Sequence, residues 1–464
     1  MSITDKLRSL FTGKIVEKYT LVNTFGCPER PDQNCPTFLV RGIHKSFENA
    51  IESYNVIVVY GESRQGKTWT IERYCPSQLR IGCNATMAID DIKSEMLQAV
   101  GLKVRKIDHC VTEEYQENIG SLCRVGGEML VAAGANVETS RGYKEILSTS
   151  YETVDLNSDA DFYQKLKSKG TGKFFVFDNF HYLDPAIQQK FCTLLKEFNY
   201  QGIKIIIVGV WKDASKITAL APDLVNRCAH IDVGSWSDEE LNQIVELGSK
   251  ALNIEIADET IKIFKNYSAN NIGIFKDFLQ KYCQEFNIRE TVPYRQILSD
   301  ETKTQRVVAA IINEAFTPLR DRIINLALPH RDRRDSKYLR LKIIIAVLQL
   351  IIETEQSESR GGISFAILKE KLEELYNKWH EQKIGVSNLA QELGKLHERE
   401  ENWQTGVNFI PLFYYDKTNK RLLILEPTIY VIKEYDSMML QDIVGELEKN
   451  IIGNENEVQE SFLN

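Results

Sequence analysis

The sequence predicts an α/β fold in which a five-stranded, mainly parallel sheet is followed by a helical lid and a smaller α+β domain. Two observations predict it. In the first half of the chain, short apolar runs alternate with helical stretches, the pattern of parallel strands joined by crossover helices. After the fifth run the apolar spacing becomes helical, and it stays so until a strand–turn–strand pattern near residue 415.

Each of the five expected strands is a mostly apolar run of four to six residues, short enough for a strand rather than a helix. The first run contains three valines and no charged residue, which indicates burial on both faces of the sheet. The runs are residues 56–60, 79–83, 174–177, 203–208 and 229–233.

Helical signals dominate after the fifth strand. Ser237 and Glu240 form a predicted capping box, in which each side chain bonds to the other residue's backbone N–H. Helices are expected at about 238–251, 258–267 and 271–286. The expected division is an N-terminal arm at 1–36, a core at 37–236 with a loop-rich insertion at about 102–170, the lid at 237–292, a helical and winged-helix-like region at 293–450, and a flexible polar tail at 451–464.

The composition is that of a globular protein with a sizeable core, since 43% of the 464 residues are hydrophobic. A net charge of −8 excludes a general electrostatic fit to nucleic acid, so any basic site must be a local patch. No secretory pattern opens the chain, and the longest apolar run, about 343–352, is half of what a membrane span needs. The nine cysteines include no C-x-x-C pair. We therefore expect a cytoplasmic protein with reduced thiols and no membrane contact.

A glycine-rich loop follows the first expected strand and opens a helix at about 67–74. Its pattern, G-x-x-x-x-G-K-T, predicts a phosphate-binding loop for a nucleoside triphosphate, ATP with Mg²⁺. Gly61 and Gly66 permit backbone angles that turn successive N–H groups toward an anion. Lys67 is expected to reach the β- and γ-phosphates, and the Thr68 hydroxyl to be a ligand of Mg²⁺. The residues expected to bind the nucleotide here are Gly61, Glu62, Ser63, Arg64, Gln65, Gly66, Lys67 and Thr68.

A second site residue follows the third strand. Four apolar residues at 174–177 end in an acid, a pattern that predicts delivery of Asp178 to the Mg²⁺ shell through water. A strand that ends in a capping aspartate is the structural alternative. Thr68 and Asp178 are the expected metal ligands. The expected catalytic residues are Lys67, Asp178, Asn179 and Arg227.

Over about residues 37–290 the chain resembles the AAA+ and STAND branches of the P-loop ATPases. The resemblance rests on the phosphate loop, on the spacing from it to Asp178, and on the helices after the fifth strand. The segment 177–183, Phe-Asp-Asn-Phe-His-Tyr-Leu, is similar to the Asp-Asp-x-His form of the second motif in STAND-type regulators and related prokaryotic ATPases. The resemblance implies a P-loop NTPase fold and ATPase activity.

Asn179 departs from the family pattern, in which a glutamate at this position polarises the attacking water. An amide cannot accept a proton as a base, although it can orient a water molecule by hydrogen bonding. His181 is a second candidate for that role, and a structural histidine beside Tyr182 is the alternative. We therefore expect slow, switch-like turnover.

Three further residues are site candidates by resemblance. Arg227 matches an arginine that reaches into a neighbouring subunit's nucleotide, and a surface arginine at a helix C-terminus is the alternative. Lys276 matches the second sensor, with a solvated lysine as the alternative. Arg41 belongs to a segment that packs near the adenine. We assign no first sensor, because Trp211 and Lys212 stand where a small polar residue is expected.

The last third of the chain has the element order of a winged helix. Helices are expected at about 339–352, 365–379 and 386–398, followed by strands at 411–415 and 421–425. The third helix carries a net negative charge, which opposes contact with phosphates. For this region we favour contact with protein, or an intramolecular role, over binding to DNA.

A basic cluster lies between residues 320 and 342, where eight basic residues are diluted by three aspartates. The cluster predicts phosphate contact with DNA or RNA. A solvated linker with local ion pairs is the alternative. The residues of this cluster that we single out are Arg331, Arg333 and Arg334.

These features together predict a nucleotide-gated switch, in which ATP closes the lid and changes how the C-terminal region is presented. Such a switch would self-assemble or act on a separate effector protein, and the resemblance places related proteins in anti-phage defence. A DNA-binding adaptor akin to origin-recognition or transposition ATPases is the second hypothesis. A nucleotide-binding module without hydrolysis is the third.

Overall fold

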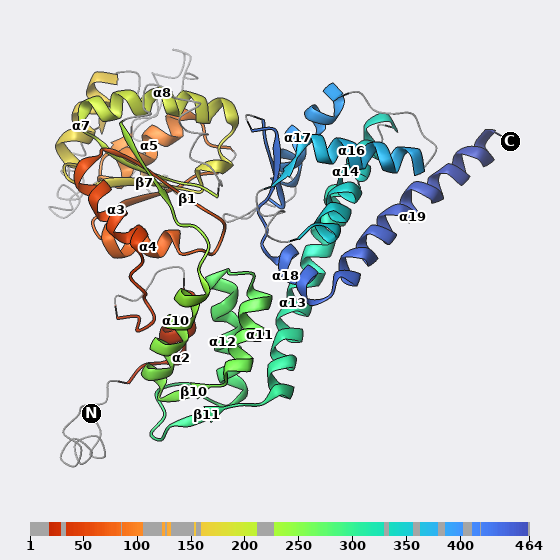
Figure 1. The fold of residues 1–464 in the computed structure, drawn as a ribbon. Helices are drawn as coiled ribbons and strands as arrows, with labels where there is room; N and C mark the ends of the chain where they lie inside the picture. The colour runs from red at the N-terminus through yellow and green to blue at the C-terminus, as the bar shows by residue number, and fades with distance from the viewer. Residues whose placement is uncertain are drawn as a thin grey trace.

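The computed structural model shows an α/β core joined through a helical lid to long helices of the C-terminal half (Figure 1). The residues that it describes are 18–28, 34–84, 86–104, 123–125, 128–130, 153–154, 159–210, 227–328, 334–355, 362–378, 386–401, 411–417 and 419–462.

The central sheet of the core has five strands in the order β2-β7-β8-β1-β9, and every pairing is parallel. The five predicted strands are confirmed, each to within one residue at either end. Strand β1, which lies between β8 and β9, is buried at every residue except its last. The strands are β1 (Val56–Tyr60), β2 (Leu79–Gly82), β7 (Phe174–Asp178), β8 (Lys204–Val208) and β9 (Cys228–Asp232).

Helices cover both faces of this sheet and complete a three-layer core (Figure 1). Alternate residues of β1 point to opposite faces, so Val56 and Val58 pack in one apolar cluster and Ile57 and Val59 in another. The first cluster is closed by α5 (Ile89–Ala99), α7 (Asp159–Lys169) and α8 (Pro185–Gln201), and the second by α3 (Gly42–Ser53) and α4 (Lys67–Tyr74).

The insertion expected at 102–170 is not loop-rich throughout, and the prediction was wrong for its last part. There α7 buries Phe162, Tyr163 and Leu166 in the core, because their spacing gives the helix one apolar face. Short strands account for other described residues of the insertion. Strands β3 (Lys103–Val104) and β6 (Thr153–Val154) pair parallel, and β4 (Cys123–Val125) and β5 (Glu128–Leu130) pair antiparallel.

The three predicted lid helices are confirmed. The capping box also forms, with Ser237 Oγ accepting from Glu240 N at 3.2 Å and Glu240 Oε2 accepting from Ser237 N at 2.9 Å. A parallel pair of short strands that we did not predict closes the far end of the lid (Figure 1). The elements are α10 (Asp238–Leu252), β10 (Ile254–Ile256), α11 (Asp258–Ser268), α12 (Ile272–Glu285) and β11 (Gln296–Leu298).

The described part of the N-terminal arm is docked on the lid. Helix α2 (Leu21–Phe25) begins at the N-cap Thr20 and buries Phe25 completely. Gly248 of α10 makes room for this ring, since a Cβ there would lie 2.2 Å from Phe25 Cε1.

We expect Gly248→Ala to destabilise the protein by about 1–3 kcal/mol, because the added methyl group forces the Phe25 ring out of its site. Urea unfolding measures the change. The matched control is Gly445→Ala in the C-terminal helix, where a Cβ meets nothing within 4 Å and helix propensity favours alanine by about 0.5–1 kcal/mol. Equal unfolding free energies for the two variants would contradict the docking of α2 on α10.

The C-terminal half confirms the predicted helices and hairpin. Its central helix is fully buried from Ile343 to Leu348, and a third strand joins the hairpin in an antiparallel sheet of order β12-β14-β13. The winged-helix assignment stays a prediction. The elements are α13 (Glu301–Ala327), α14 (Arg334–Glu353), β12 (Ile363–Ser364), α16 (Phe365–Lys378), α17 (Val386–Glu401), β13 (Phe413–Asp416), β14 (Arg421–Ile424), α18 (Thr428–Tyr435) and α19 (Ser437–Phe462).

The last helix differs from the flexible tail expected at 451–464. Helix α19 continues to Phe462. Residues 451–464 contain no proline, and their single glycine, Gly453, is not enough to interrupt the helix. Among the described helices, none combines the length and apolarity that crossing a membrane requires.

Candidate functional site

The phosphate loop joins the end of β1 to the start of α4. Its two glycines have positive φ angles, 137° at Gly61 and 97° at Gly66, which other residues rarely adopt. Gly66 is the N-cap of α4, and a Cβ added to it would meet nothing within 4 Å. The positively polarised N-terminus of α4 therefore opens onto free space beside the loop.

Three consecutive carbonyls of this loop accept hydrogen bonds from the lid and from Trp236, which directly precedes it. The bonds run from Asn271 Nδ2 to Ser63 O (2.9 Å), from Gly273 N to Arg64 O (3.2 Å) and from Trp236 Nε1 to Gln65 O (3.3 Å). A planar trans peptide holds N–H opposite C=O, so the N–H groups of residues 64–66 point away from the lid. No acceptor for these N–H groups lies in the described part of the chain. They are the donors that an anion would need.

Lys67 supplies positive charge to the loop. Its Nζ donates to Gly61 O at 2.8 Å and to Glu62 O at 2.6 Å, so the ammonium group is folded back over the loop. Burial lowers the pKa of Lys67 to about 8, against the opposing influence of the Asp178 carboxylate. An ammonium group has three N–H donors. The third is the one that remains for a phosphate oxygen.

Arg64 ties the loop to the lid from the outside. Its φ of 60° is a left-handed conformation that costs energy for a non-glycine residue. Its Nη2 donates to Asp277 Oδ2 of α12 at 2.6 Å. Gly273 lies against it, since a Cβ there would be 2.7 Å from the Cβ of Arg64. These contacts with α12 offset the backbone strain at Arg64.

Asp178 stands at the carboxyl end of β7, beside the phosphate loop. Its Oδ2 accepts from Arg80 Nη1 at 2.5 Å, and its Oδ1 accepts from the N–H of Asn179 at 3.0 Å. Asn179 adopts a left-handed conformation, with φ of 57°, that asparagine tolerates better than glutamate does. The backbone here favours the amide over the acid that the family pattern has.

Thr68 and Asp178 fit a magnesium ion by the chemistry of their donors. Both offer oxygen, and both line the same cavity. Mg²⁺ is held in such sites by one or two protein oxygens, phosphate oxygens and water. No group of three or more His, Cys, Asp or Glu side chains suited to a metal occurs among the described residues, so a site built entirely from protein ligands finds no support there.

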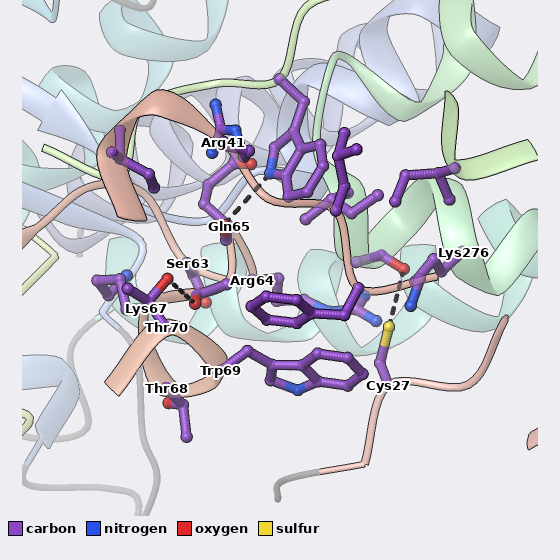
Figure 2. A pocket seen from close by; sticks show the side chains of 18 of the residues that line it. Cys27, Arg41, Ser63, Arg64, Gln65, Lys67, Thr68, Trp69, Thr70 and Lys276 are labelled. Atoms are coloured by element: carbon purple, nitrogen blue, oxygen red, sulfur yellow. Dashed lines mark hydrogen bonds between the residues drawn. The ribbon is translucent and has the colours of Figure 1, made fainter. Parts of the chain in front are cut away.

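The loop forms one wall of a cavity of about 290 Å³ (Figure 2). The N-terminal arm, the segment 37–44 that follows it and the lid form the others, and the arm is fixed by a hydrogen bond from Trp69 Nε1 to Pro28 O at 3.1 Å. The predicted site residues that line the cavity are Arg41, Ser63, Arg64, Gln65, Gly66, Lys67, Thr68, Asp178, Asn179 and Lys276, whereas Gly61, Glu62 and Arg227 do not.

Arg41 is fixed in the cavity wall. Its guanidinium donates to Glu240 Oε1 at 2.7 Å, to Val233 O at 2.8 Å and to Ser235 O at 2.9 Å. The same group lies 4.3 Å from the ring centroid of Trp236. Arg41 therefore joins the start of α3 to the start of the lid, and contact with adenine stays a prediction.

Lys276 is not the solvated lysine that we considered as the alternative. Its side chain is 4% exposed, and its Nζ lies 4.7 Å from the ring centroid of Trp69. Burial lowers its pKa, and it has no carboxylate partner in the described part of the chain. Figure 2 shows Lys276 and Lys67 at opposite ends of the cavity. A buried cation without an anion is a strong candidate for contact with a ligand.

His44 is a cavity residue that the sequence did not single out. Its Nδ1 accepts from the backbone N–H of Arg41 at 3.0 Å, so the proton resides on Nε2, which lies 3.3 Å from Thr70 Oγ1. Burial and the Arg41 cation lower the pKa of His44 to about 4, which keeps the ring neutral. Thr70 Oγ1 also donates to Gly66 O, and the chain of bonds links the start of α3 to the phosphate loop.

His181 and Arg227 lie away from the cavity. His181, in the short helix η2 (Phe180–Tyr182), is 6% exposed and packs against Tyr182, with 4.1 Å between the ring centroids and the ring planes tilted by 50°, which supports the structural alternative. Arg227 is exposed at the amino end of β9, opposite the carboxyl ends where the loop lies. It cannot reach a nucleotide in its own chain. Trp211, Lys212, Arg331 and Arg333 lie outside the described residues, as does the side chain of Arg334.

The strand order and the loop together decide the fold. The phosphate loop follows the strand between β8 and β9, and Asp178 ends a strand two places away. The core is a P-loop NTPase fold. No model of a protein family matches the chain, and no curated protein matches it.

Several solved structures resemble the chain at low identity. The Walker-type ATPase PABY2304 of Pyrococcus abyssi has 12% identity and a TM-score of 0.47, with coverage of 87% of this chain and 96% of its own. The Orc1 protein of Aeropyrum pernix, solved in complex with DNA, has 11% identity and a TM-score of 0.38, with coverage of 92% and 97%. Thermotoga maritima RuvB, a Holliday junction branch migration motor, has 13% identity and a TM-score of 0.31, with coverage of 83% of this chain and 91% of its own. With TM-scores below 0.5, none of them carries an argument about activity.

Proposed function

We propose that this chain is an ATP-binding ATPase of the AAA+/STAND type, in which ATP with Mg²⁺ fixes the position of the helical lid. The observation that carries the proposal is the set of three bonds from two lid residues and the adjoining Trp236 to the carbonyls of residues 63–65. The peptide groups that would bind phosphate through N–H are the same groups that hold the lid through C=O. Hydrogen bonds at the two ends of a peptide group polarise each other, so each strengthens the other.

Slow hydrolysis follows from the residue next to Asp178. In this proposal Asp178 holds the metal through water, and Asn179 orients the attacking water without accepting its proton. The backbone at Asn179 is left-handed, so the amide is built into this turn rather than being an incidental replacement. Slow turnover gives the ATP-bound state a long lifetime, which suits a switch.

The nucleotide state would control self-assembly of the chain or its binding to a separate effector protein. The exposed position of Arg227, at the edge of the sheet away from its own loop, supports a contact with the nucleotide of a neighbouring subunit. Nucleic-acid binding through Arg331, Arg333 and Arg334 is the alternative use of the C-terminal half.

Hydrogen exchange tests the coupling between nucleotide and lid. We expect ATP with Mg²⁺ to slow amide exchange in α12 of the wild type by about fivefold, because the stabilisation from one additional hydrogen bond is about 1 kcal/mol. Asn271→Ala removes the side chain that caps α12 and donates to Ser63 O. In this variant the protection should fall to about twofold or less.

Asn253→Ala is the matched control for that experiment. Asn253 also lies in the lid and donates from its amide to a carbonyl, Val292 O at 3.0 Å, but it does not contact the phosphate loop. The control should keep the ATP-dependent protection of α12. Loss of protection in both variants, or in neither, would count against the coupling.

A further inference from the structure

A cluster of three charged side chains stands behind the predicted metal ligand Asp178. Arg80 of β2 donates from Nη1 to Asp178 Oδ2 at 2.5 Å and from Nη2 to Glu72 Oε1 at 3.1 Å. Glu72 belongs to α4, the helix that starts at Lys67. Each of the three side chains is about a quarter exposed or less, so water screens the cluster only in part.

The register of the sheet explains how Arg80 reaches Asp178. Gly82 pairs with Asp178 across β2 and β7, and Arg80 lies two residues earlier on the same face. Gly82 has no side chain, and a Cβ there would meet nothing within 4 Å. The Arg80 side chain is thus free to extend past Gly82 to the carboxylate.

The charges of the cluster determine how strongly the Asp178 carboxylate attracts a cation. Asp178 alone carries −1, and the pair of Arg80 and Glu72 adds no net charge. The position of the pair still matters, because Arg80 contacts Asp178 directly whereas Glu72 contacts Arg80. A divalent cation next to Asp178 therefore feels repulsion from Arg80 more strongly than attraction to Glu72.

We propose that Arg80 is the counter-ion of Asp178 in the metal-free protein and competes with Mg²⁺ for this carboxylate, while Glu72 weakens the competition by holding the guanidinium. The inference rests on the proposed binding of a magnesium–nucleotide complex at the phosphate loop. Arg80 sets the Mg²⁺ concentration at which the site becomes loaded, and it keeps an ion-pair partner in Glu72 when Asp178 turns to the metal.

The two partners of this pair should shift metal affinity in opposite directions. Arg80→Ala removes the competing cation and should lower the Mg²⁺ concentration for half-maximal loading by about threefold to tenfold. Glu72→Gln removes the restraining anion and should raise that concentration by about twofold to fivefold. Arg80→Lys keeps the charge but not the planar fork that holds both carboxylates, so its midpoint should lie between those of Arg80→Ala and the wild type. A cluster that only supports the fold would weaken metal binding in both neutralised variants.

Binding of a fluorescent ATP analogue, followed as Mg²⁺ is titrated from EDTA-chelated to millimolar free ion, measures these midpoints without depending on hydrolysis. The matched control is Arg295→Ala, which removes an exposed arginine of the Arg295–Glu255 pair on the lid and should leave the midpoint unchanged. Higher ionic strength should reduce both shifts, because the cluster is partly exposed.

Opposite shifts for Arg80→Ala and Glu72→Gln support the proposal. Shifts in the same direction, or midpoints equal to that of the wild type, overturn it. Far-ultraviolet circular dichroism and unfolding curves confirm that each variant is folded. Absence of analogue binding to the wild type in both EDTA and Mg²⁺ would instead refute the proposed function, so the two failures are distinct.

Discussion

Lys67→Ala is expected to weaken ATP binding by about 100-fold or more. The Lys67 ammonium group lies over the phosphate loop, where it bonds to the carbonyls of Gly61 and Glu62. A charge-assisted hydrogen bond contributes about 1.5–3 kcal/mol. One such bond to a phosphate oxygen, at the upper end of this range, accounts for the expected loss. Isothermal titration with ATP and Mg²⁺ measures it.

The fold should survive this substitution. Desolvation penalises the Lys67 charge in the free protein, so its removal costs little stability. Lys250→Ala, at an exposed lysine of the lid, is the control and should bind ATP as the wild type does. An affinity of Lys67→Ala within threefold of the wild type would mean that the nucleotide does not bind at this loop.

Asp178→Ala is expected to reduce ATP hydrolysis by about 100-fold or more, because the metal loses the carboxylate that holds it through water and the γ-phosphate loses charge neutralisation. Binding of ATP in EDTA should change by less than about threefold, since Lys67 and the loop N–H groups remain. Release of inorganic phosphate gives the rate, and titration in EDTA gives the affinity.

Asp442→Asn, at an exposed position of α19, is the control for that variant. It should hydrolyse ATP at the wild-type rate. Undiminished hydrolysis by Asp178→Ala would remove Asp178 from the metal site. Equal loss of affinity with and without Mg²⁺ would show that the residue supports the loop rather than the metal.

Local sequence patterns predicted most of the fold. The strands were predictable because each is a short apolar run, and Gly61 and Gly66 identified the loop because the required backbone angles exclude most other residues. The capping box at Ser237 and Glu240 marked the start of the lid. The same kind of signal was present in Phe162 and its neighbours, where we expected a loop.

Contacts between distant parts of the chain were not predictable from one sequence. The Arg80–Asp178 pair joins residues 98 positions apart, and no local pattern distinguishes Arg80 from any surface arginine. The burial of Lys276 over Trp69 likewise depends on how the lid closes on α4. The hydrogen bonds to the carbonyls of residues 63–65 were not predictable either, because only the tertiary fold brings donors such as Asn271 to the phosphate loop.

Equilibrium titration of the wild-type protein with ATP, with Mg²⁺ and with EDTA, tests the central claim most directly. The structure predicts saturable binding of one ATP per chain, tighter with Mg²⁺ than without it, because Thr68 and Asp178 add metal ligands to the contacts of the loop. No saturable binding in either condition would contradict the claim that residues 61–68 form a nucleotide site.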